Sequence, residues 1–512
     1  MSLLSDLRKA LYYCQRNGLA ETCFAVAERL SERRAAETRR PYVYETPSES
    51  VLEAQRMRAG NPRPRISIVV PAYETPKEFL YAMLQSVAAQ TCPDWELLLM
   101  DGSESDTVEE NTKAFLALQT EENRQKIKYH RIPNEGIAEN TNRGIRLAEG
   151  EYVAFLDHDD LLTPDSIYKI TEGIDAAKKT GVLVKLLYSD EDKCDKTGRK
   201  FSEPHKKQNF NLDLLLSNNY ICHLMAVETA LAKELRLRSE FDGAQDYDFA
   251  LRVVERILFP AKKTLPNAEI KNSPADDEKQ IVHIPRVLYH WRNHATSTAQ
   301  NPQSKLYAYE AGRRAADAFI RRRGWRAHAE DTVHLGFYRV AYDADIFSVR
   351  KDVAMVGGAV FDKRGRTVGG IYEGGRLIFA GLPKKFSGTL HRASLMQDAE
   401  TLDVRCFRLR PELREEFATF CEGETTGAGD GAHKRIAGKE NMPDMPDKKT
   451  SDEKHLPTET RVEQIERKGG ALSLPCAQET FARFCALLRE KGWRLLYDPT
   501  MCDENNGHYS EL

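Results

Sequence analysis

The alternation of short strand-like runs with helix-patterned stretches over residues 66–160 constrains the fold of this 512-residue chain more than any other feature. Short runs at 66–70, 95–100, 127–132 and 152–156 predict strands. Helical periodicity falls between them, at 80–87, 107–121 and 140–148. This spacing predicts a parallel α/β sheet, in which ligands bind beyond the carboxyl ends of the strands.

The predicted strand ends carry polar and acidic residues. Residues 71–73 (Pro-Ala-Tyr) follow the first strand, Asp101 follows the second, and the run 157–160 (Asp-His-Asp-Asp) follows the fourth. Carboxylates two residues apart reach the same point in front of a sheet edge, and their mutual repulsion favours a cation. Hard divalent ions take such oxygen ligands and share them with phosphates. The alternative is that Asp159 or Asp160 caps the next helix.

Three later segments add candidate functional residues. The acidic run 188–193 is, by itself, more typical of a solvated turn. Asp246 stands at a glycine-led helix start, where a carboxylate can act as a general base or as a helix cap. His290 and Arg292 supply an imidazole that can complete a divalent site and a guanidinium that can bind phosphate. A lone histidine near a strand is, however, more often structural.

Charge and composition exclude several classes of protein. With 75 basic and 78 acidic residues, the chain has a net charge of −3 and lacks the basic excess of a general nucleic-acid-binding surface. An anionic ligand must therefore be bound by a local site. No run reaches the length of a transmembrane helix, and Asp6 lies inside what would be the apolar region of a signal peptide. Ten cysteines without a C-x-x-C pair predict reduced cytoplasmic thiols.

The ends of the chain differ in pattern from its middle. Residues 1–37 predict two short helices broken at Asn17-Gly18, either a hairpin packed on the main domain or a membrane-surface anchor. Residues 38–62 are rich in proline and charge and predict a linker. The polar stretch 261–280 predicts a loop. Residues 422–468 lack aromatic side chains and predict a disordered insertion.

Several segments between 64 and 300 resemble, in order, the inverting family 2 glycosyltransferases with the GT-A fold. They are ISIVVPAYET, MDGSESDT, NEGIAENTNRGIRLAEGEYVAFLDHDDLLTPDSI, YSDEDK, NLDLLLSNNYICHLMAV, FDGAQDYDFALRVVE and IPRVLYHWRNHATSTA. The later segments resemble the bacterial polysaccharide branch, which includes rhamnosyltransferase-like and O-antigen-type enzymes. For residues 63–325 the resemblance implies an α/β, nucleotide-diphospho-sugar transferase fold with a mostly parallel sheet.

The resemblance also assigns roles to residues. It implies that Asp157, Asp159 and His290 hold Mn2+ or Mg2+, and that Asp246 is the catalytic base. The residues implied to bind the nucleotide sugar are Pro71, Ala72, Tyr73, Glu74, Asp101, Asn142, Asp157, His158 and Arg292. Those implied on the acceptor side are Asp190, Asp192, Gln245 and Trp291. Thr141 departs from the arginine that many members carry at this position, so one phosphate or base contact stays open.

The C-terminal third resembles the later half of a second family 2 module. Residues 353–370 predict a strand, a turn and a strand, and residues 481–499 predict a helix followed by a strand. A second strand opening and a second acidic DxD motif are missing after residue 337, and Gln478-Glu479-Thr480 replaces an expected acidic pair. Residues 326–512 are therefore predicted to be a degenerate module without catalysis, or else an unrelated α/β appendage. Residues 1–62 are the predicted arm and linker.

The leading hypothesis is a metal-dependent inverting glycosyltransferase that moves a sugar from a nucleotide sugar to a hydroxyl of a cell-surface polysaccharide or lipid-linked glycan. The implied location is the cytoplasm, with peripheral attachment at the inner face of the plasma membrane. We do not expect a nucleic acid among its partners. The alternative is a non-catalytic nucleotide-sugar-binding or scaffold subunit of a polysaccharide assembly complex. A nucleotidyltransferase is disfavoured, because the residues after Val70 lack a glycine-rich loop bearing Lys or Arg.

Overall fold

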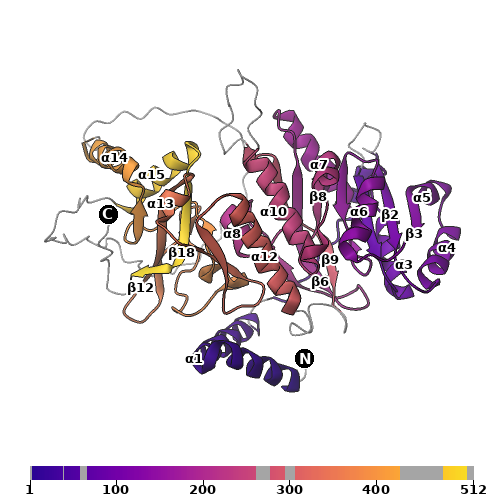
Figure 1. Ribbon diagram of the computed structural model, residues 1–512, viewed down its shortest axis with the longest axis horizontal. Coiled ribbons are helices and arrows are strands. Elements are labelled where there is room, and N and C mark those ends of the chain that lie inside the picture. The colour runs from indigo at the N-terminus through magenta and orange to yellow at the C-terminus, as the bar shows by residue number, and fades with distance from the viewer. Residues whose placement is uncertain are drawn as a thin grey trace, which may run out of the picture.

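The computed structural model describes residues 3–37, 40–57, 66–260, 277–293, 306–426 and 477–503. Figure 1 shows a sheet with helices on the right, a second and smaller sheet on the left, and helix α1 (Leu3–Glu37) along one side of the molecule. Among the described helices, none is both long and apolar enough to cross a bilayer.

The larger sheet is mixed, with its four predicted strands forming a parallel half. Its strands are β1 (Ile66–Ala72), β2 (Trp95–Asp101), β3 (Ile127–Arg131), β4 (Tyr152–Phe155), β5 (Leu161–Leu162), β6 (Leu186–Cys194), β7 (Phe201–His205), β8 (Met225–Glu228) and β9 (Ile281–Arg292). The order is β3-β2-β1-β4-β8-β6-β9-β5, with β7 beside β6. The β3-β2-β1-β4 pairs are parallel, which confirms the predicted α/β class.

Helices cover both faces of this sheet, which explains why its central strands read as continuous apolar runs. They are α3 (Lys77–Ala88), α4 (Thr107–Ala117), α5 (Glu121–Lys126), α6 (Ile137–Leu147), α7 (Ser166–Lys179), α8 (Leu212–Ser217), α9 (Thr229–Leu235), α10 (Gln245–Leu258) and α12 (Leu306–Arg322). Val69 faces the cluster that contains Ile145 of α6, whereas Ile68 faces the cluster that contains Leu84 of α3. Successive β1 side chains therefore serve opposite layers.

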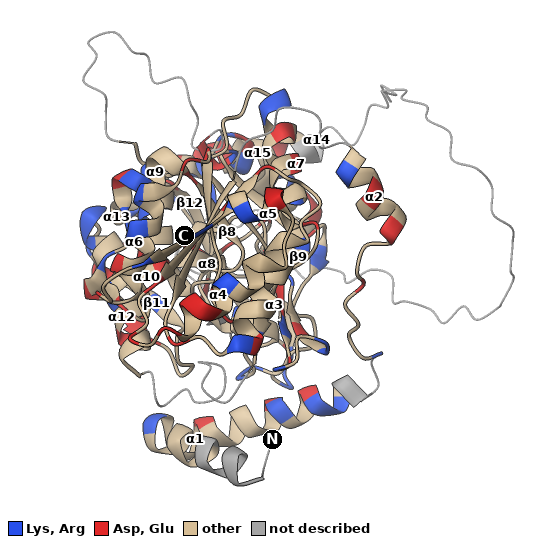
Figure 2. Ribbon diagram, turned by 90° about the vertical axis from the view of Figure 1, so that its right-hand side faces the viewer, with Lys and Arg blue, Asp and Glu red and all other residues tan. Residues whose placement is uncertain are grey.

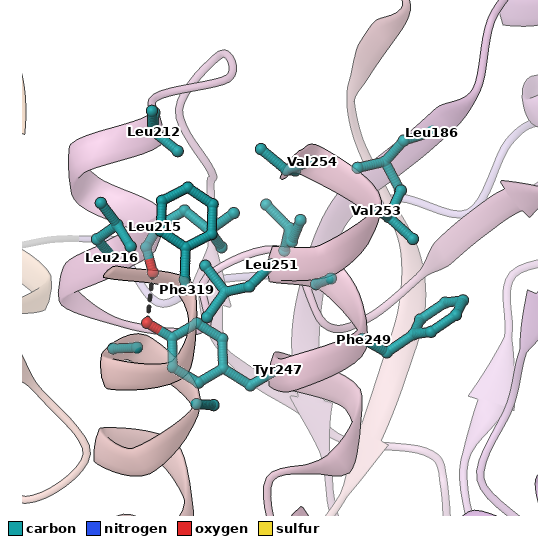
Figure 3. Close-up of a cluster of buried hydrophobic side chains, with 14 of the residues drawn as sticks. Leu186, Leu212, Leu215, Leu216, Tyr247, Phe249, Leu251, Val253, Val254 and Phe319 are labelled. Atoms are coloured by element: carbon teal, nitrogen blue, oxygen red, sulfur yellow. Dashed lines mark hydrogen bonds between the residues drawn. The ribbon is translucent and has the colours of Figure 1, made fainter. Parts of the chain in front are cut away.

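Helices α8, α10 and α12 form a core beside the sheet (Figure 3). Phe319 of α12 and Leu251 of α10 pack there with the leucines of α8. The Tyr247 hydroxyl donates a hydrogen bond to the Leu215 carbonyl at 2.6 Å. This bond fixes the first turn of α10, which carries Asp246, against α8.

Four local expectations differ from the structure. Residues 161–162 form strand β5, and α7 begins only at Ser166, so Asp159 and Asp160 do not cap a helix. The acidic run 188–193 lies within the buried strand β6, not in a solvated turn. The stretch 107–121 contains α4 and the start of α5, with a break before Glu121.

The predicted linker is the fourth difference, because it contains helix α2 (Glu49–Met57). Its Leu52 and Gln55 are buried, and the Thr91 hydroxyl donates to Gln55 Oε1 at 2.8 Å. Of the predicted insertion, residues 422–426 close helix α14 (Arg414–Thr426), and residues 427–468 lie outside the described residues. Most of the predicted loop 261–280 also lies outside them.

The smaller sheet confirms the elements predicted in the C-terminal third. Its order is β13-β12-β18-β16, with β17 on β12: β12 (Val353–Phe361), β13 (Thr367–Gly369), β16 (Gln397–Asp398), β17 (Phe407–Leu409) and β18 (Arg494–Asp503). Helix α15 (Gln478–Glu490) ends before Gly492, whose φ of +85° is the left-handed value expected after a helix. A hairpin of β10 (Ala327–Asp331) and β11 (Tyr338–Tyr342) precedes this sheet.

The two sheets are joined through a common core and a buried ionic cluster. Val353 and Leu496 of the small sheet belong to the same hydrophobic cluster as Leu212 of α8. Beside them, the fully buried Arg350 donates to both oxygens of Asp213 at 2.7 and 3.0 Å. It also donates to Asp352. The C-terminal part therefore folds against α8 of the main sheet.

Helix α1 confirms the predicted break, since Gly18 has non-helical angles within it (φ 84°, ψ 169°). Its described contacts reach the C-terminal third and not the main sheet. The Arg16 and Asn17 side chains donate to the carbonyls of Thr332 and Val333, both at 3.1 Å.

Replacing Arg350 with methionine tests the ionic cluster. It leaves Asp213 as an uncompensated buried charge, so we expect the free energy of unfolding to fall by about 3–5 kcal/mol. Urea denaturation followed by circular dichroism measures this loss. The control is Arg408→Met, which removes an exposed ion pair with Asp345 and is expected to cost about 1 kcal/mol or less. Equal losses in the two variants would contradict the assigned role of Arg350.

Candidate active site

Asp101 is fixed at the carboxyl end of β2, as the topology predicts. It is fully buried, and it accepts hydrogen bonds from the Ser103 amide at 2.9 Å and the Tyr129 hydroxyl at 2.7 Å. The neighbouring strand end is tied to it, because the Gly102 amide donates to the Ala72 carbonyl. The ends of β1 and β2 thus form one rigid edge.

Glu74 links the β1 end to the loop after β2. It adopts a left-handed φ of +46°. Its Oε1 accepts from the amides of Glu104 and Ser105, and its Oε2 accepts from the Ser105 hydroxyl at 2.6 Å. The hydrogen bonds from Ser105 hold the pKa of Glu74 below its ordinary value. Its neighbour Tyr73 is 45% exposed and so offers an accessible ring at this edge.

The acidic loop after β4 is anchored by Asp160 and Tyr289. The Tyr289 hydroxyl donates to Asp160 Oδ2 at 2.6 Å and accepts from the Asp157 amide at 3.2 Å. Asp160 Oδ1 accepts from the Arg292 amide at 2.7 Å. Burial, together with the nearby charges of Asp159 and Asp157, raises the pKa of Asp160 well above its usual range. Asp160 therefore holds the acidic loop against strand β9 through these hydrogen bonds.

The Asp157 side chain, in contrast, is 48% exposed. The partial burial of its other half raises the pKa of Asp157, the nearby His223 opposes this rise, and Asp159 adds to it. A carboxylate in such surroundings gains from a neighbouring cation. His158 lies on the β1 side of this loop, where its Nδ1 is 2.9 Å from the Thr75 hydroxyl.

His223 is the residue that sequence reasoning missed. Its Nε2 lies 3.9 Å from Asp157 Oδ2, and its ring stacks on Tyr289 at a centroid distance of 4.8 Å. On the other side, its Nδ1 lies 3.0 Å from Glu191 Oε2. Burial lowers the pKa of His223, but Cys222 and Glu191 outweigh it, and the pKa lies well above the usual range. It stands in the stretch NNYICHL, part of the resemblance, which carried no local pattern that marked it.

Glu191 is the member of the acidic run that faces the site. Lys207 approaches it to 3.7 Å and His205 to 3.2 Å, in addition to His223. Despite burial, these partners hold the pKa of Glu191 well below its usual range. The alternation of side chains along a strand could have separated it from Asp190 and Asp192 once β6 was known to be a strand.

Asp190, Asp192 and His290 have other partners. His290 Nδ1 lies 2.5 Å from Asp192 Oδ1, and Asp190 Oδ1 lies 2.8 Å from His283 Nε2. Tyr44 and Phe201 pack against the His290 ring. Because His290 and Tyr289 are adjacent on β9, their side chains point to opposite faces, and Tyr289 faces the acidic loop. The structure therefore brings His223, and not His290, beside Asp157.

Asn142 and Arg292 are held by protein groups. The buried Asn142 amide exchanges two hydrogen bonds with the Leu237 backbone, at 2.8 and 2.9 Å, so it is a structural residue and not an accessible donor-binding group. Arg292 is also buried; it donates through Nε to the Asp159 carbonyl and through Nη1 to the Lys196 carbonyl. The contact with Asp159 stabilises the acidic loop.

Asp246 lies at the first turn of α10, as predicted. Its Oδ2 accepts a hydrogen bond from the Asn219 side chain at 2.8 Å. Burial raises the pKa of Asp246, while the nearby His223 and the Asn219 hydrogen bond oppose that rise. Gln245 beside it accepts from the Gly243 amide, and Trp291 lies 5.7 Å from the His223 ring. The candidate base and the acidic loop thus share His223 as a neighbour.

The donor groups at this edge fit a hard divalent cation. Asp157 and Asp159 offer carboxylate oxygens, and the pKa of Asp157 is raised by surroundings that a cation would relieve. Glu191, Cys222 and His223 also place ligand atoms within 4.8 Å of one another, but a thiol and an imidazole are softer ligands than a hard divalent cation prefers. His290 does not join either group, because its ring lies on the other face of β9, against Tyr44 and Phe201.

Comparison with known proteins identifies the main sheet. A family model described as glycosyl transferase family 2 matches residues 67–236. Over this stretch the chain is similar to glycosyl transferase family 2. The chain is 36% identical over 260 residues to an uncharacterized protein (y4gI) of Sinorhizobium fredii, covering 51% of this chain and 26% of that protein.

Two further similarities accompany the family 2 match. The O-antigen biosynthesis protein RfbC of Myxococcus xanthus is 31% identical over 282 residues, which are 55% of this chain and 20% of that protein. The chain thus spans about a quarter or less of these two relatives. A mannosyltransferase from Pyrobaculum calidifontis, solved with GDP-Man and Mn2+, has 14% identity and a TM-score of 0.33 over 59% of this chain and 75% of that one.

Comparing the variants Asn142→Ala and Asp157→Ala should distinguish a structural residue from a binding residue. Asn142→Ala leaves the buried Leu237 amide and carbonyl unsatisfied, so we expect a loss of about 1–3 kcal/mol in stability with unchanged nucleotide-sugar affinity. Asp157→Ala relieves carboxylate crowding and should retain stability while weakening nucleotide-sugar binding. Thermal unfolding and titration calorimetry measure the two properties. Weakened binding in a fully folded Asn142→Ala variant would restore the original expectation.

Proposed function

We propose that this protein is an inverting glycosyltransferase that moves a sugar from a nucleotide-sugar donor to a hydroxyl of a cell-surface polysaccharide or lipid-linked glycan. The family 2 match over residues 67–236 supports glycosyl transfer. The similarity to an O-antigen biosynthesis protein supports a polysaccharide acceptor. The donor would lie along the β1–β2 edge, near Tyr73, Glu74 and Asp101.

One observation carries the mechanistic part of the proposal. Asp246 on α10 and Asp157 after β4 come from different parts of the chain, yet both are influenced by the charge of His223. This shared neighbour supports our assignment of Asp246 as the base and Asp157 as the phosphate-side carboxylate of one site. An inverting displacement needs that arrangement, because the base and the leaving group act on opposite sides of the reacting carbon.

In the proposed reaction, Asp246 accepts the proton of the acceptor hydroxyl. The hydroxyl oxygen forms a bond to the anomeric carbon as the bond from that carbon to the diphosphate oxygen breaks, and the nucleoside diphosphate leaves with the bonding electrons. Burial raises the pKa of Asp246, which strengthens the carboxylate as a base. Asn219 orients the carboxylate through its hydrogen bond.

Asp157 and Asp159 would hold Mn2+ or Mg2+, which would supply positive charge to the leaving diphosphate. The protein's own contribution is to fix the acidic loop. Tyr289 and Arg292 bind its backbone and Asp160 from β9, so the two carboxylates keep their position when the donor binds. Trp291, on the same side as His223, is the aromatic surface that we assign to the acceptor.

The first experiment replaces Asp246 with asparagine. We expect transfer to fall at least about 1,000-fold, because the acceptor proton loses its base, while donor affinity stays within about twofold. Glu240→Gln, at an exposed neighbouring carboxylate, is the matched control and should retain activity. The assay measures nucleoside diphosphate release with UDP-, GDP- and dTDP-sugars, lipid-linked acceptors and Mn2+.

Removing the metal with a chelator should abolish the same signal, and adding Mn2+ or Mg2+ should restore it. Metal-independent donor binding without turnover for any sugar would favour the scaffold subunit over the enzyme. Full activity in Asp246→Asn would show that Asp246 is not the catalytic base.

Asn219→Ala tests the pH dependence of the proposed base. Transfer needs ionised Asp246, so the rate falls as pH drops through its pKa. The Asn219 hydrogen bond favours the ionised form, and its loss should raise the pKa and move the acid limb of kcat/KM to higher pH. The control is Asn218→Ala, one residue away. Among the described contacts, the Asn218 side chain donates only to the Leu214 carbonyl, so its loss should leave the pH profile unchanged. An unshifted limb in Asn219→Ala would contradict the coupling.

A further inference from the structure

The second half of α1 docks on the protein through its polar side. Glu28 is 8% exposed and accepts hydrogen bonds from the amides of Ser387 and Gly388, both at 2.8 Å, and from the Ser387 hydroxyl at 3.0 Å. Glu21, two turns earlier, meets Lys385 at 3.3 Å. A carboxylate buried in this way fixes the helix in one rotational setting.

The opposite side of the same helix is apolar and exposed. We call its exposed residues the arm stripe: Leu19 (71% exposed), Cys23, Val26 (43%) and Leu30 (48%). Leu19, Val26 and Leu30 recur at helical spacing and so share one face. A surface helix ordinarily turns such a face toward the core. This helix does the reverse, which marks the arm stripe as a contact surface for something outside the fold.

The charges beside the arm stripe indicate what that surface contacts. Between residues 29 and 34, the exposed charged side chains are Arg29, Arg33, Arg34 and one acidic residue, Glu32. The acidic side chains of Glu21 and Glu28 are directed to the protein. A second copy of this helix would offer the same positive charge, which opposes self-association. An anionic lipid surface offers the complementary charge together with an apolar layer.

We propose that α1 is a membrane-surface helix, whose arm stripe inserts at the headgroup boundary of an anionic bilayer while its arginines contact lipid phosphates. The helix lies in the plane of the surface, in agreement with the finding that no described helix can span a bilayer. Leu11, in the first half of α1, is a further exposed apolar side chain (57%). Figure 2 shows α1 as an outlying helix at one edge of the molecule, where a flat surface can reach it.

The test is vesicle co-sedimentation of the full chain without donor or acceptor, so its result is independent of the proposed transfer. Vesicles contain phosphatidylcholine alone or mixed with phosphatidylglycerol. We expect binding to the mixed vesicles that weakens with salt. The double variant Leu19→Asp/Leu30→Asp should reduce this binding by about tenfold or more. The control Leu118→Asp/Leu183→Asp changes two leucines outside α1 that are at least as exposed, and it should bind as the unaltered chain does.

A second variant, Arg29→Glu/Arg34→Glu, keeps the arm stripe and reverses the charge beside it. It should lose the preference for anionic vesicles. Three results would overturn the proposal: no vesicle binding by the unaltered chain, equal binding by the stripe variant and its control, or a dimer in light scattering that Leu19→Asp/Leu30→Asp converts to a monomer. The last result would assign the arm stripe to a second copy of the chain.

Discussion

The buried pair between Arg350 and Asp213 is the interaction on which the arrangement of the two sheets depends. Asp213 belongs to α8, beside the larger sheet, and Arg350 precedes the first strand of the smaller one. Neither charge reaches water, so loss of Arg350 would leave Asp213 as an uncompensated buried charge. Asn211 and Asp398 add paired hydrogen bonds across the same junction, at 2.9 Å in both directions. The junction therefore specifies a relative position as well as contributing contact area.

This junction lies close to the proposed chemistry. Helix α8 leads directly to Asn219, which bonds Asp246, and the Leu215 carbonyl of α8 receives the Tyr247 hydroxyl from α10. On the far side, the Tyr247 ring stacks with Tyr338 of β11. The C-terminal part can thus influence the proposed reaction by positioning the residues around Asp246.

The elements were largely predictable from the sequence, whereas side-chain partners were not. The strand and helix order of residues 66–156, the break at Gly18 and the helix start at Asp246 follow from local periodicity and turn chemistry. His290 and His223 show the limit. Each stands in a plain apolar segment, and only the pairing of β9 with β6 and the stacking on Tyr289 decides which one reaches Asp157. The role of Asn142 could not be predicted for a similar reason, because its hydrogen-bond partner, Leu237, is distant in sequence.

The charged side chains of strand β6 help to determine its register in the sheet. Three successive carboxylates, Asp190 to Asp192, each meet a different basic partner: His283, the group around Lys207, and His290. A slip by one residue would exchange the faces and leave every acid opposite the wrong neighbour, buried and uncompensated. Apolar strands tolerate such slips more readily because their side chains are nearly interchangeable. The matched acidic and basic side chains therefore favour one register of β6 and disfavour misaligned pairing while the sheet assembles.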